Sequence, residues 1–264
     1  DSISGQWDYV EPALFGYAAG KLIESFTSFY HEHNYIVAQF HEWMTGTGIL
    51  YLKKHVPWVA TAFTTHATVL GRCIAGNNRP LYGKMKDYVP AQVAREFNVI
   101  SKQSLEKISA AEADVFTTVS GITSRECSHF LGKDVDIVTP NGFEDSFVPP
   151  PELFDEKRKA ARDRLKKVAE AVLGYGLKDD CLFIANSGRY EFRNKGVDIF
   201  IDSLGELNKK EKPGKDCVAF IMMPAYHKGP RQDVADVLYN NGPANGGDRY
   251  LTHSLHYPSS DPVL

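Results

Sequence analysis

The 264-residue sequence has few cysteines, no large excess of either charge and no long apolar run. Its four cysteines lie far apart and form no CxxC pair, so neither a zinc knuckle nor a dithiol redox motif is expected. Reduced thiols of this kind are typical of cytoplasmic proteins. The formal net charge of −3 provides no general attraction to nucleic acid or to an anionic membrane. No uncharged apolar segment is long enough to cross a bilayer. These absences predict a cytoplasmic protein with no nucleic-acid partner and no membrane partner.

Several motifs of common enzyme classes are also missing or incomplete. The stretch TGTGILY has Tyr51 where a dinucleotide-binding fingerprint requires its third glycine, so we expect a helix packed tightly on a sheet instead. The HEW stretch at His41 lacks the second histidine of a zinc protease, and no GxSxG nucleophile motif is present. No DxD-type pair of carboxylates is positioned to hold a metal. The sequence therefore predicts chemistry without a metal or a cofactor.

Short apolar runs alternate with helical or turn-like stretches along the chain. This alternation is typical of α/β proteins with parallel sheets, whose strands are buried on both faces. The expected strands are residues 35–40, 58–65, 114–119, 136–140, 181–188 and 217–225. The expected helices are residues 11–33 (with Leu14, Ala18, Leu22 and Phe26 on one side), 120–131 (capped by Ser120 and ended by Gly132), 155–173 (ended by Gly174), 195–210 and 231–239.

The composition changes at Phe143–Phe154, which reads FEDSFVPPPELF. Three consecutive prolines cannot sit inside a helix or a central strand, so a linker or crossover is expected there. The sequence therefore predicts two domains, residues 1–148 and 149–264. The charged helix that follows carries acids among its bases and an apolar stripe that includes Leu165 and Val172, which is typical of a solvated helix face.

Polar residues follow three of the expected strands in the first half. His41 and Glu42 follow the first strand, His66 follows the second, and Asn141 and Gly142 follow the fourth. Ligands of parallel α/β sheets bind outside the carboxyl ends of the strands. A single histidine there is more often structural than catalytic. Several polar groups meeting on one rim indicate a binding site.

Two cations form a second group, in the turn between an expected strand and a helix of the second half. Arg189 and Lys195 stand six residues apart in SGRYEFRNKG, directly before the helix. Backbone N–H groups at a helix N-terminus favour an anion, and two cations would reinforce this preference for a phosphate or diphosphate group. The alternative is a surface turn with incidental charges, of which Arg193 is a third.

Five stretches together make the sequence similar to the eukaryotic-type glycogen synthases. They are FHEWMTGTGILYLKK, FTTHATVLGR, AEADVFTTVSGITSRE, DIVTPNGF and GRYEFRNKGVDIF. The resemblance implies two Rossmann-like domains in the GT-B architecture, both incomplete in this chain. It also implies transfer of glucose from a nucleotide sugar, UDP-glucose or ADP-glucose, to the non-reducing end of an α-1,4-glucan such as glycogen, with retained configuration. UDP-glucose is the preferred donor, and the resemblance suggests a homo-oligomer.

The resemblance implies catalytic roles for His66, Arg189 and Lys195. His66 would contact the donor glucose, and its main chain would help to stabilise an oxocarbenium-like transition state. Arg189 and Lys195 would neutralise the departing diphosphate, which is electrostatic catalysis by preorganised groups.

The resemblance also implies a set of residues that bind the donor. Arg72 would reach the sugar or the diphosphate, and Asn141, next to Gly142, would hydrogen-bond a sugar hydroxyl. His41 would shape the floor of the glucose pocket.

The family's glycine-containing donor loop, its donor-binding glutamate segment and its arginine-rich regulatory helix have no counterpart in these residues. The histidine-containing part of the regulatory site is not found around Pro150–Lys159 either. We therefore expect an internal portion of a glycogen synthase, with little or no activity alone. Two alternatives remain open: another retaining GT-B glucosyltransferase, of the sucrose or trehalose type, and a catalytically silent module that binds carbohydrate or nucleotide.

Overall fold

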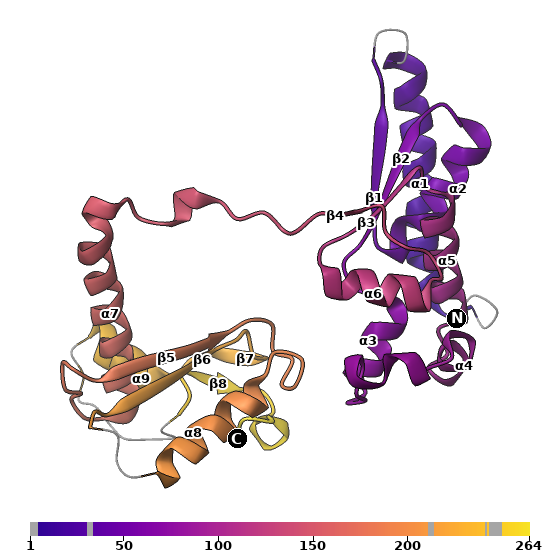
Figure 1. Ribbon diagram of the computed structural model, residues 1–264. Coiled ribbons are helices and arrows are strands. Elements are labelled where there is room, and N and C mark those ends of the chain that lie inside the picture. The colour runs from indigo at the N-terminus through magenta and orange to yellow at the C-terminus, as the bar shows by residue number, and fades with distance from the viewer. Residues whose placement is uncertain (1–4, 31–33, 211–213, 241, 243–249) are drawn as a thin grey trace. The chain divides into compact units, whose positions relative to one another are not determined.

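The computed structural model describes residues 5–30, 34–210, 214–240, 242 and 250–264, which form two compact units (Figure 1). Unit 1 ends at Phe143 and unit 2 begins at Glu144, whereas the sequence predicts the border between residues 148 and 149. Both units combine parallel strands with helices. The predicted α/β class is therefore confirmed.

Unit 1 is built on a four-stranded parallel sheet with the strand order β1-β2-β3-β4. The strands are β1 (Val37–His41), β2 (Ala60–Thr65), β3 (Val115–Thr118) and β4 (Ile137–Val138). The helices are α1 (Trp7–Tyr30), α2 (Gly46–His55), α3 (Val69–Gly76), α4 (Pro90–Glu96), α5 (Ile100–Glu112) and α6 (Gly121–Phe130), with short 3-10 helices η1 (Trp43–Thr45) and η2 (Tyr82–Asp87). β2, β3 and β4 fall within the predicted ranges, and β1 ends at His41, one residue beyond the predicted range.

A row of three phenylalanine rings crosses the centre of this sheet. Phe40 in β1 pairs with Phe63 in β2, which pairs in turn with Phe116 in β3. The rings of Phe63 and Phe116 stack at a centroid distance of 5.7 Å, and both residues are fully buried. Partners in a parallel ladder point to the same face, so the three rings lie in one layer. Burial of each ring contributes about 2 kcal/mol to the free energy of folding.

Helix α2 lies against this ring layer at very short range. A Cβ atom at Gly48 would lie 2.5 Å from Cε1 of Phe40 and 2.7 Å from the carbonyl oxygen of Gly16 in α1. Only a residue without a side chain fits between the sheet and α1. The predicted reading of TGTGILY as a helix packed tightly on the sheet is confirmed.

Helix α1 is present as predicted, but its packed side differs from the apolar side expected. Leu14, Ala18, Leu22 and Phe26 are exposed, and the buried residues of α1 are the small ones: Gly16, Gly20 and Thr27. The close approach of α2 explains the difference, because small residues allow two helix backbones to come close. The predicted helix extended to residue 33, and residues 31–33 lie outside the described residues.

Unit 2 contains two small sheets. They are formed by the parallel pair β5 (Leu182–Ser187) and β6 (Cys217–Met222) and by the antiparallel pair β7 (His227–Pro230) and β8 (His253–Leu255). The helices are α7 (Pro151–Leu173), α8 (Val197–Lys209) and α9 (Gln232–Tyr239), and η3 (Asp145–Phe147) and η4 (Pro258–Ser260) are short 3-10 helices. The sequence predicted β5, β6 and the three helices but gave no signal for the β7–β8 pair.

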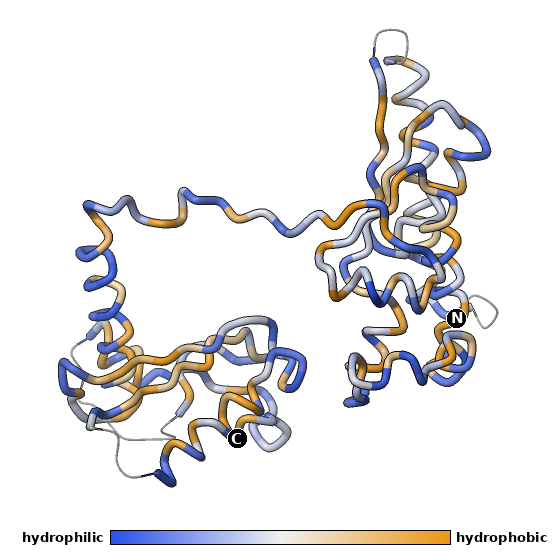
Figure 2. Tube along the Cα trace, viewed as in Figure 1, coloured by the Kyte–Doolittle hydropathy of each residue, from blue (hydrophilic) through white to orange (hydrophobic). Residues whose placement is uncertain are grey.

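Helix α7 begins earlier than predicted, at the third of the three prolines. Pro151 occupies the first helical turn, where its missing N–H is no loss and its fixed φ suits a helix. The predicted linker is therefore shorter at this end. Gly174 ends the helix in the left-handed conformation, with φ 77°, as predicted. Hydrophilic residues cover much of α7 (Figure 2), while its last turns pack Val172 against Val234 of α9.

Within the described ranges, no helix combines the length and the apolar character needed to cross a membrane. The four cysteines, Cys73, Cys127, Cys181 and Cys217, are all free thiols.

Candidate functional site

His41 and His66 meet at the carboxyl edge of the unit 1 sheet. Strands β1 and β2 are parallel neighbours, and His41 at the end of β1 pairs with Thr64, two residues before His66. Nδ1 of His41 lies 3.1 Å from Nε2 of His66, so one ring donates a hydrogen bond to the other. The structure therefore brings together two residues that the sequence placed at separate strand ends.

Glu42 links the backbone of His66 to the side chain of Arg72. Its Oε1 accepts a hydrogen bond from the His66 amide at 3.1 Å and one from Nη2 of Arg72 at 3.2 Å. Glu42 has a φ of 63°, a conformation that non-glycine residues rarely adopt and that is often found at functional sites. The sequence places Glu42 at a strand end but indicates no role for it, because its backbone conformation cannot be read from the sequence.

Residues 65–72, named the His66 loop from here on, rest on the buried carboxyl group of Glu106 in α5. One oxygen of Glu106 accepts a hydrogen bond from the Thr65 hydroxyl at 2.9 Å, and the other accepts one from the Val69 amide at 3.0 Å. Glu106 has no solvent exposure. Burial raises the pKa of this carboxyl group to about 8, although its two hydrogen bonds act in the opposite direction.

A second buried carboxylate, Glu126 of α6, holds the same loop further along. It accepts hydrogen bonds from the Thr68 hydroxyl at 2.9 Å and from the Tyr82 hydroxyl at 2.8 Å. Thr68 is the N-cap of α3, and its hydroxyl also accepts a hydrogen bond from the Gly71 amide at 3.0 Å. Burial and this contact raise the pKa of Tyr82 to about 12. The His66 loop is thus fixed by side chains from two helices.

Asn141 and Gly142 lie beyond the end of β4 and are exposed. The parallel strand order puts them at the same edge of the sheet as His41 and His66. Among the described residues, Asn141 has no hydrogen-bond partner through its side chain. The structure therefore places both on the predicted rim without bringing them into contact with the two histidines.

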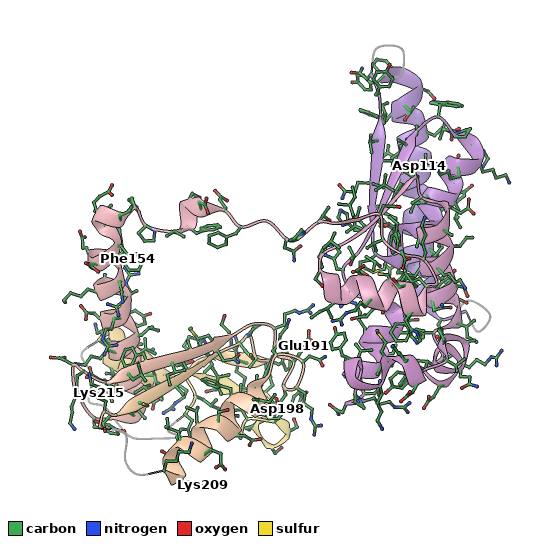
Figure 3. The ribbon with its side chains drawn as sticks, viewed as in Figure 1. Asp114, Phe154, Glu191, Asp198, Lys209 and Lys215 are labelled. Atoms are coloured by element: carbon green, nitrogen blue, oxygen red, sulfur yellow. The ribbon has the colours of Figure 1, made fainter. Side chains whose placement is uncertain are left out.

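Arg189 and Lys195 occupy the turn between β5 and α8 in unit 2, named the Arg189 turn (residues 188–196). Both side chains are exposed, and Nε of Arg189 lies 2.9 Å from Oε1 of Glu191. Gly196 adopts a left-handed φ of 65° directly before α8. Figure 3 shows Glu191 near the end of unit 2 where β5 meets α8. Glu191 therefore neutralises part of the positive charge that the sequence predicted here.

Tyr190 ties this turn to the last residues of the chain. Its hydroxyl donates a hydrogen bond to Oδ1 of Asp261 at 2.5 Å, and the same oxygen accepts a hydrogen bond from the Val263 amide at 2.9 Å. Burial and the neighbouring carboxylate raise the pKa of Tyr190. The sequence offered no signal for this contact between residues far apart in the chain.

Two buried acceptor atoms near the Arg189 turn have no hydrogen-bond partner in the described part of the chain. They are Oδ1 of Asn186 and Oδ1 of Asp198. The amide nitrogen of Asn186 donates to the Lys195 carbonyl at 3.4 Å, so this side chain lies next to the turn. An unsatisfied buried acceptor costs about 1–3 kcal/mol. A ligand with hydroxyl groups would supply the missing donors.

Across the ranges that the structure describes, no three His, Cys, Asp or Glu side chains cluster as ligands for a metal ion. The candidate site residues described above carry imidazole, cationic and carboxylate groups.

Residues 7–233 match the family model described as glycogen synthase. The chain is 38% identical over 222 residues to a glycogen [starch] synthase of Dictyostelium discoideum, which covers 81% of this chain and 25% of that protein. It is 35% identical over 224 residues to the Neurospora crassa glycogen [starch] synthase, and the match covers 81% of this chain and 31% of that protein. It is 34% identical over 219 residues to the liver glycogen [starch] synthase of Rattus norvegicus, and that match covers 80% of this chain and 31% of that protein. The chain thus spans about a quarter to a third of the length of the curated relatives it matches.

Proposed function

The chain belongs to the glycogen synthase family, and from that premise we propose that it is an internal part of a retaining glucosyltransferase. The proposed reaction transfers glucose from UDP-glucose to the non-reducing end of an α-1,4-glucan, in the cytoplasm. We further propose that the two units belong to two Rossmann-like domains of the GT-B architecture. The parallel strands and flanking helices of each unit support that assignment.

The observation that carries the proposal is the arrangement of His66 and Arg72 on one carboxylate. Glu42 holds the backbone of His66 and the guanidinium of Arg72 through the same oxygen atom, with the His41 ring alongside. In glucosyl transfer, positive charge builds on the sugar and negative charge builds on the leaving diphosphate. A site that combines a fixed cation with oriented polar groups stabilises both.

In this proposal His66 contacts the donor glucose, and Arg72 reaches the sugar or the first phosphate. His41 forms the floor of the glucose pocket. Asn141, next to Gly142, binds a sugar hydroxyl, which agrees with the exposed position of both residues beyond β4.

Arg189 and Lys195 neutralise the departing nucleotide diphosphate. Their position directly before α8 supports this role, because the N-terminus of a helix already favours an anion. In the absence of a ligand, Glu191 pairs with Arg189. Because these cations supply the charge neutralisation, the proposed reaction uses no metal and no cofactor, and its partners are the nucleotide sugar and glycogen.

The test uses the full-length polypeptide that contains these 264 residues. It is incubated with glycogen and radiolabelled UDP-glucose or ADP-glucose, and label incorporated into glycogen is measured. We expect incorporation from UDP-glucose, and a fall in turnover of about 100- to 1000-fold in Arg189→Ala, as for loss of one stabilising group in a transition state. Arg193→Ala is the matched control, because Arg193 is exposed in the same turn, and it should change turnover less than twofold.

Failure to lengthen glycogen with either donor would contradict the proposal. Transfer to a small sugar acceptor would instead indicate an enzyme of the sucrose or trehalose type, and nucleotide binding without transfer would indicate a silent binding module. Equal turnover in Arg189→Ala and Arg193→Ala would show that Arg189 is only a surface residue.

A further inference from the structure

Two glutamate side chains lie fully within unit 1, although burying a carboxyl group is costly unless it gains hydrogen bonds. Glu106 is 0% exposed and Glu126 is 3% exposed. Neither has a cation among its hydrogen-bond partners in the described residues. Their partners are the hydroxyl groups of Thr65, Thr68 and Tyr82 and one backbone amide.

Three of these four contacts lie in the His66 loop. Glu106 binds the Thr65 hydroxyl and the Val69 amide, which are on either side of His66. Glu126 binds the Thr68 hydroxyl, between His66 and Arg72. The loop is therefore held at three points within five residues.

Gly71 provides independent evidence that the loop is shaped around Glu126. A Cβ atom at this position would lie 2.2 Å from Oε2 of Glu126 and 2.7 Å from the Thr68 hydroxyl oxygen, so a side chain here would displace the carboxylate. The Gly71 amide also donates to the Thr68 hydroxyl, which is itself bound to Glu126. The missing side chain lets the carboxylate reach the first turn of α3.

We propose that Glu106 and Glu126 are positioning residues. Through their hydrogen bonds to the His66 loop, they hold His66 and Arg72 in position at the edge of the sheet. This inference rests on the proposed roles of His66 and Arg72 in glucosyl transfer. Neither carboxyl group touches the substrate, and each acts through the backbone and hydroxyl groups that it binds.

The chemistry of the two contacts predicts which variants keep the loop in place. One carboxyl oxygen of Glu106 accepts a hydrogen bond from the Thr65 hydroxyl, and the other accepts one from the Val69 amide. A glutamine can accept from the Val69 amide with its oxygen and donate to the Thr65 hydroxyl oxygen with its amide group, so Glu106→Gln should preserve the loop. Glu106→Leu has a similar volume but leaves the hydroxyl and the amide without a partner.

The test measures amide hydrogen exchange and the NMR signals of the His41 and His66 rings in the 264-residue chain, so that it does not depend on glucosyl transfer. In Glu106→Leu we expect exchange at the Val69 amide to rise more than tenfold, and the ring signals of both histidines to shift. Glu106→Gln should restore both to wild-type values. The control is Glu112→Leu, at an exposed position of the same helix, which should change neither.

Protection of the Phe116 amide shows in each variant that unit 1 is folded. If Glu106→Leu does not fold, Thr65→Val and Thr68→Val replace it, since each removes one hydroxyl contact to a carboxyl group. Thr68→Val should increase exchange at the Gly71 amide at least tenfold. Unchanged exchange at Val69 and Gly71 and unchanged histidine signals in these variants would overturn the proposal, whether or not the full-length polypeptide transfers glucose.

Discussion

The His66 loop and the Arg189 turn are proposed to act on the same donor molecule, yet the protein holds them in different ways. The loop in unit 1 is fixed by the buried carboxyl groups of Glu106 and Glu126. The turn in unit 2 is held near the surface by a Tyr190–Asp261 hydrogen bond, and Arg189 itself is exposed. A group that contacts the reacting sugar needs a fixed position, whereas a cation on a long side chain can follow a diphosphate as it leaves.

The hydrophobic core of unit 1 is also larger than that of unit 2. Unit 1 has two large buried clusters around the phenylalanine row and around α3 and α4. In the described part of unit 2, a smaller cluster joins α7 and α9 and has three buried members, Ala171, Val172 and Val234. We infer that unit 1 is the more rigid half of the chain.

Among the single substitutions, the largest expected effect comes from adding one methyl group in unit 1. Gly48→Ala would force Cβ against the Phe40 ring and the Gly16 carbonyl. We expect the free energy of unfolding of unit 1 to fall by about 2–3 kcal/mol, as in other overpacked cores. All three tryptophans, Trp7, Trp43 and Trp58, lie in unit 1, so urea unfolding followed by tryptophan fluorescence measures this unit.

The matched control is Gly205→Ala in α8 of unit 2, where a Cβ atom meets no atom within 4 Å. Because alanine favours a helix, slower amide exchange in α8 is expected, equivalent to about 0.5–1 kcal/mol. If both substitutions had the same effect, the proposed difference in packing between the units would be lost.

A second effect is expected from pH, through Glu106, and it builds up over several pH units. Its pKa is raised from 4.5 to about 8 in the fold by burial and by the charges of Glu42 and Glu126. Between pH 4.5 and about 8, Glu106 keeps its proton in the folded chain but has lost it in the unfolded chain. The free energy of unfolding therefore falls as the pH rises from about 5 to 8. The slope is about 1.4 kcal/mol for each pH unit.

The measurement is urea unfolding at pH 5.5, 6.5 and 7.5, again followed by tryptophan fluorescence. Glu106→Gln should remove most of the slope, because glutamine does not titrate. Two thiols near Glu106 do not interfere: the pKa of Cys73 is raised by burial, and that of Cys127 is raised to about 12. Equal slopes in wild type and Glu106→Gln would show that Glu106 ionises in the fold as it does in water.

The smallest expected effect concerns the anchor of the Arg189 turn. Tyr190→Phe removes the hydroxyl that donates to Asp261, and loss of a hydrogen bond to a charged group costs about 1.5 kcal/mol. We expect faster amide exchange in residues 188–196 and at Val263, with unit 1 unaffected. The control is Tyr239→Phe, at an exposed position of the same unit, which should leave amide exchange unchanged. Equal exchange rates in the two variants would show that the Tyr190–Asp261 hydrogen bond does not hold the turn.

Sequence patterns predicted the features that depend on local periodicity and caps. The six predicted strands, the N-cap at Ser120 and the helix end at Gly174 arise from interactions between near neighbours. Strand ends also predicted that His41 and His66 lie at one edge of the unit 1 sheet, because parallel strands expose their carboxyl ends at a common edge.

What the sequence could not predict depends on contacts between distant residues. The exposed apolar side of α1 follows from how closely α2 approaches, and the role of Glu42 depends on a backbone conformation with positive φ. Glu106 lies in a helix with polar neighbours, and nothing in its surroundings along the chain distinguishes it from a solvated glutamate. Its burial becomes visible only once α5 is packed beneath the His66 loop.

The phenylalanine row has a consequence for errors in strand pairing. If β1 slipped by one residue against β2, Phe40 would turn to the opposite face and leave a hole beside Phe63. His41 directly follows Phe40, so any chain with its rings correctly aligned also has its first imidazole on the proper side. Correct packing of the phenylalanine layer thus also fixes the side of the sheet on which the His41 ring lies.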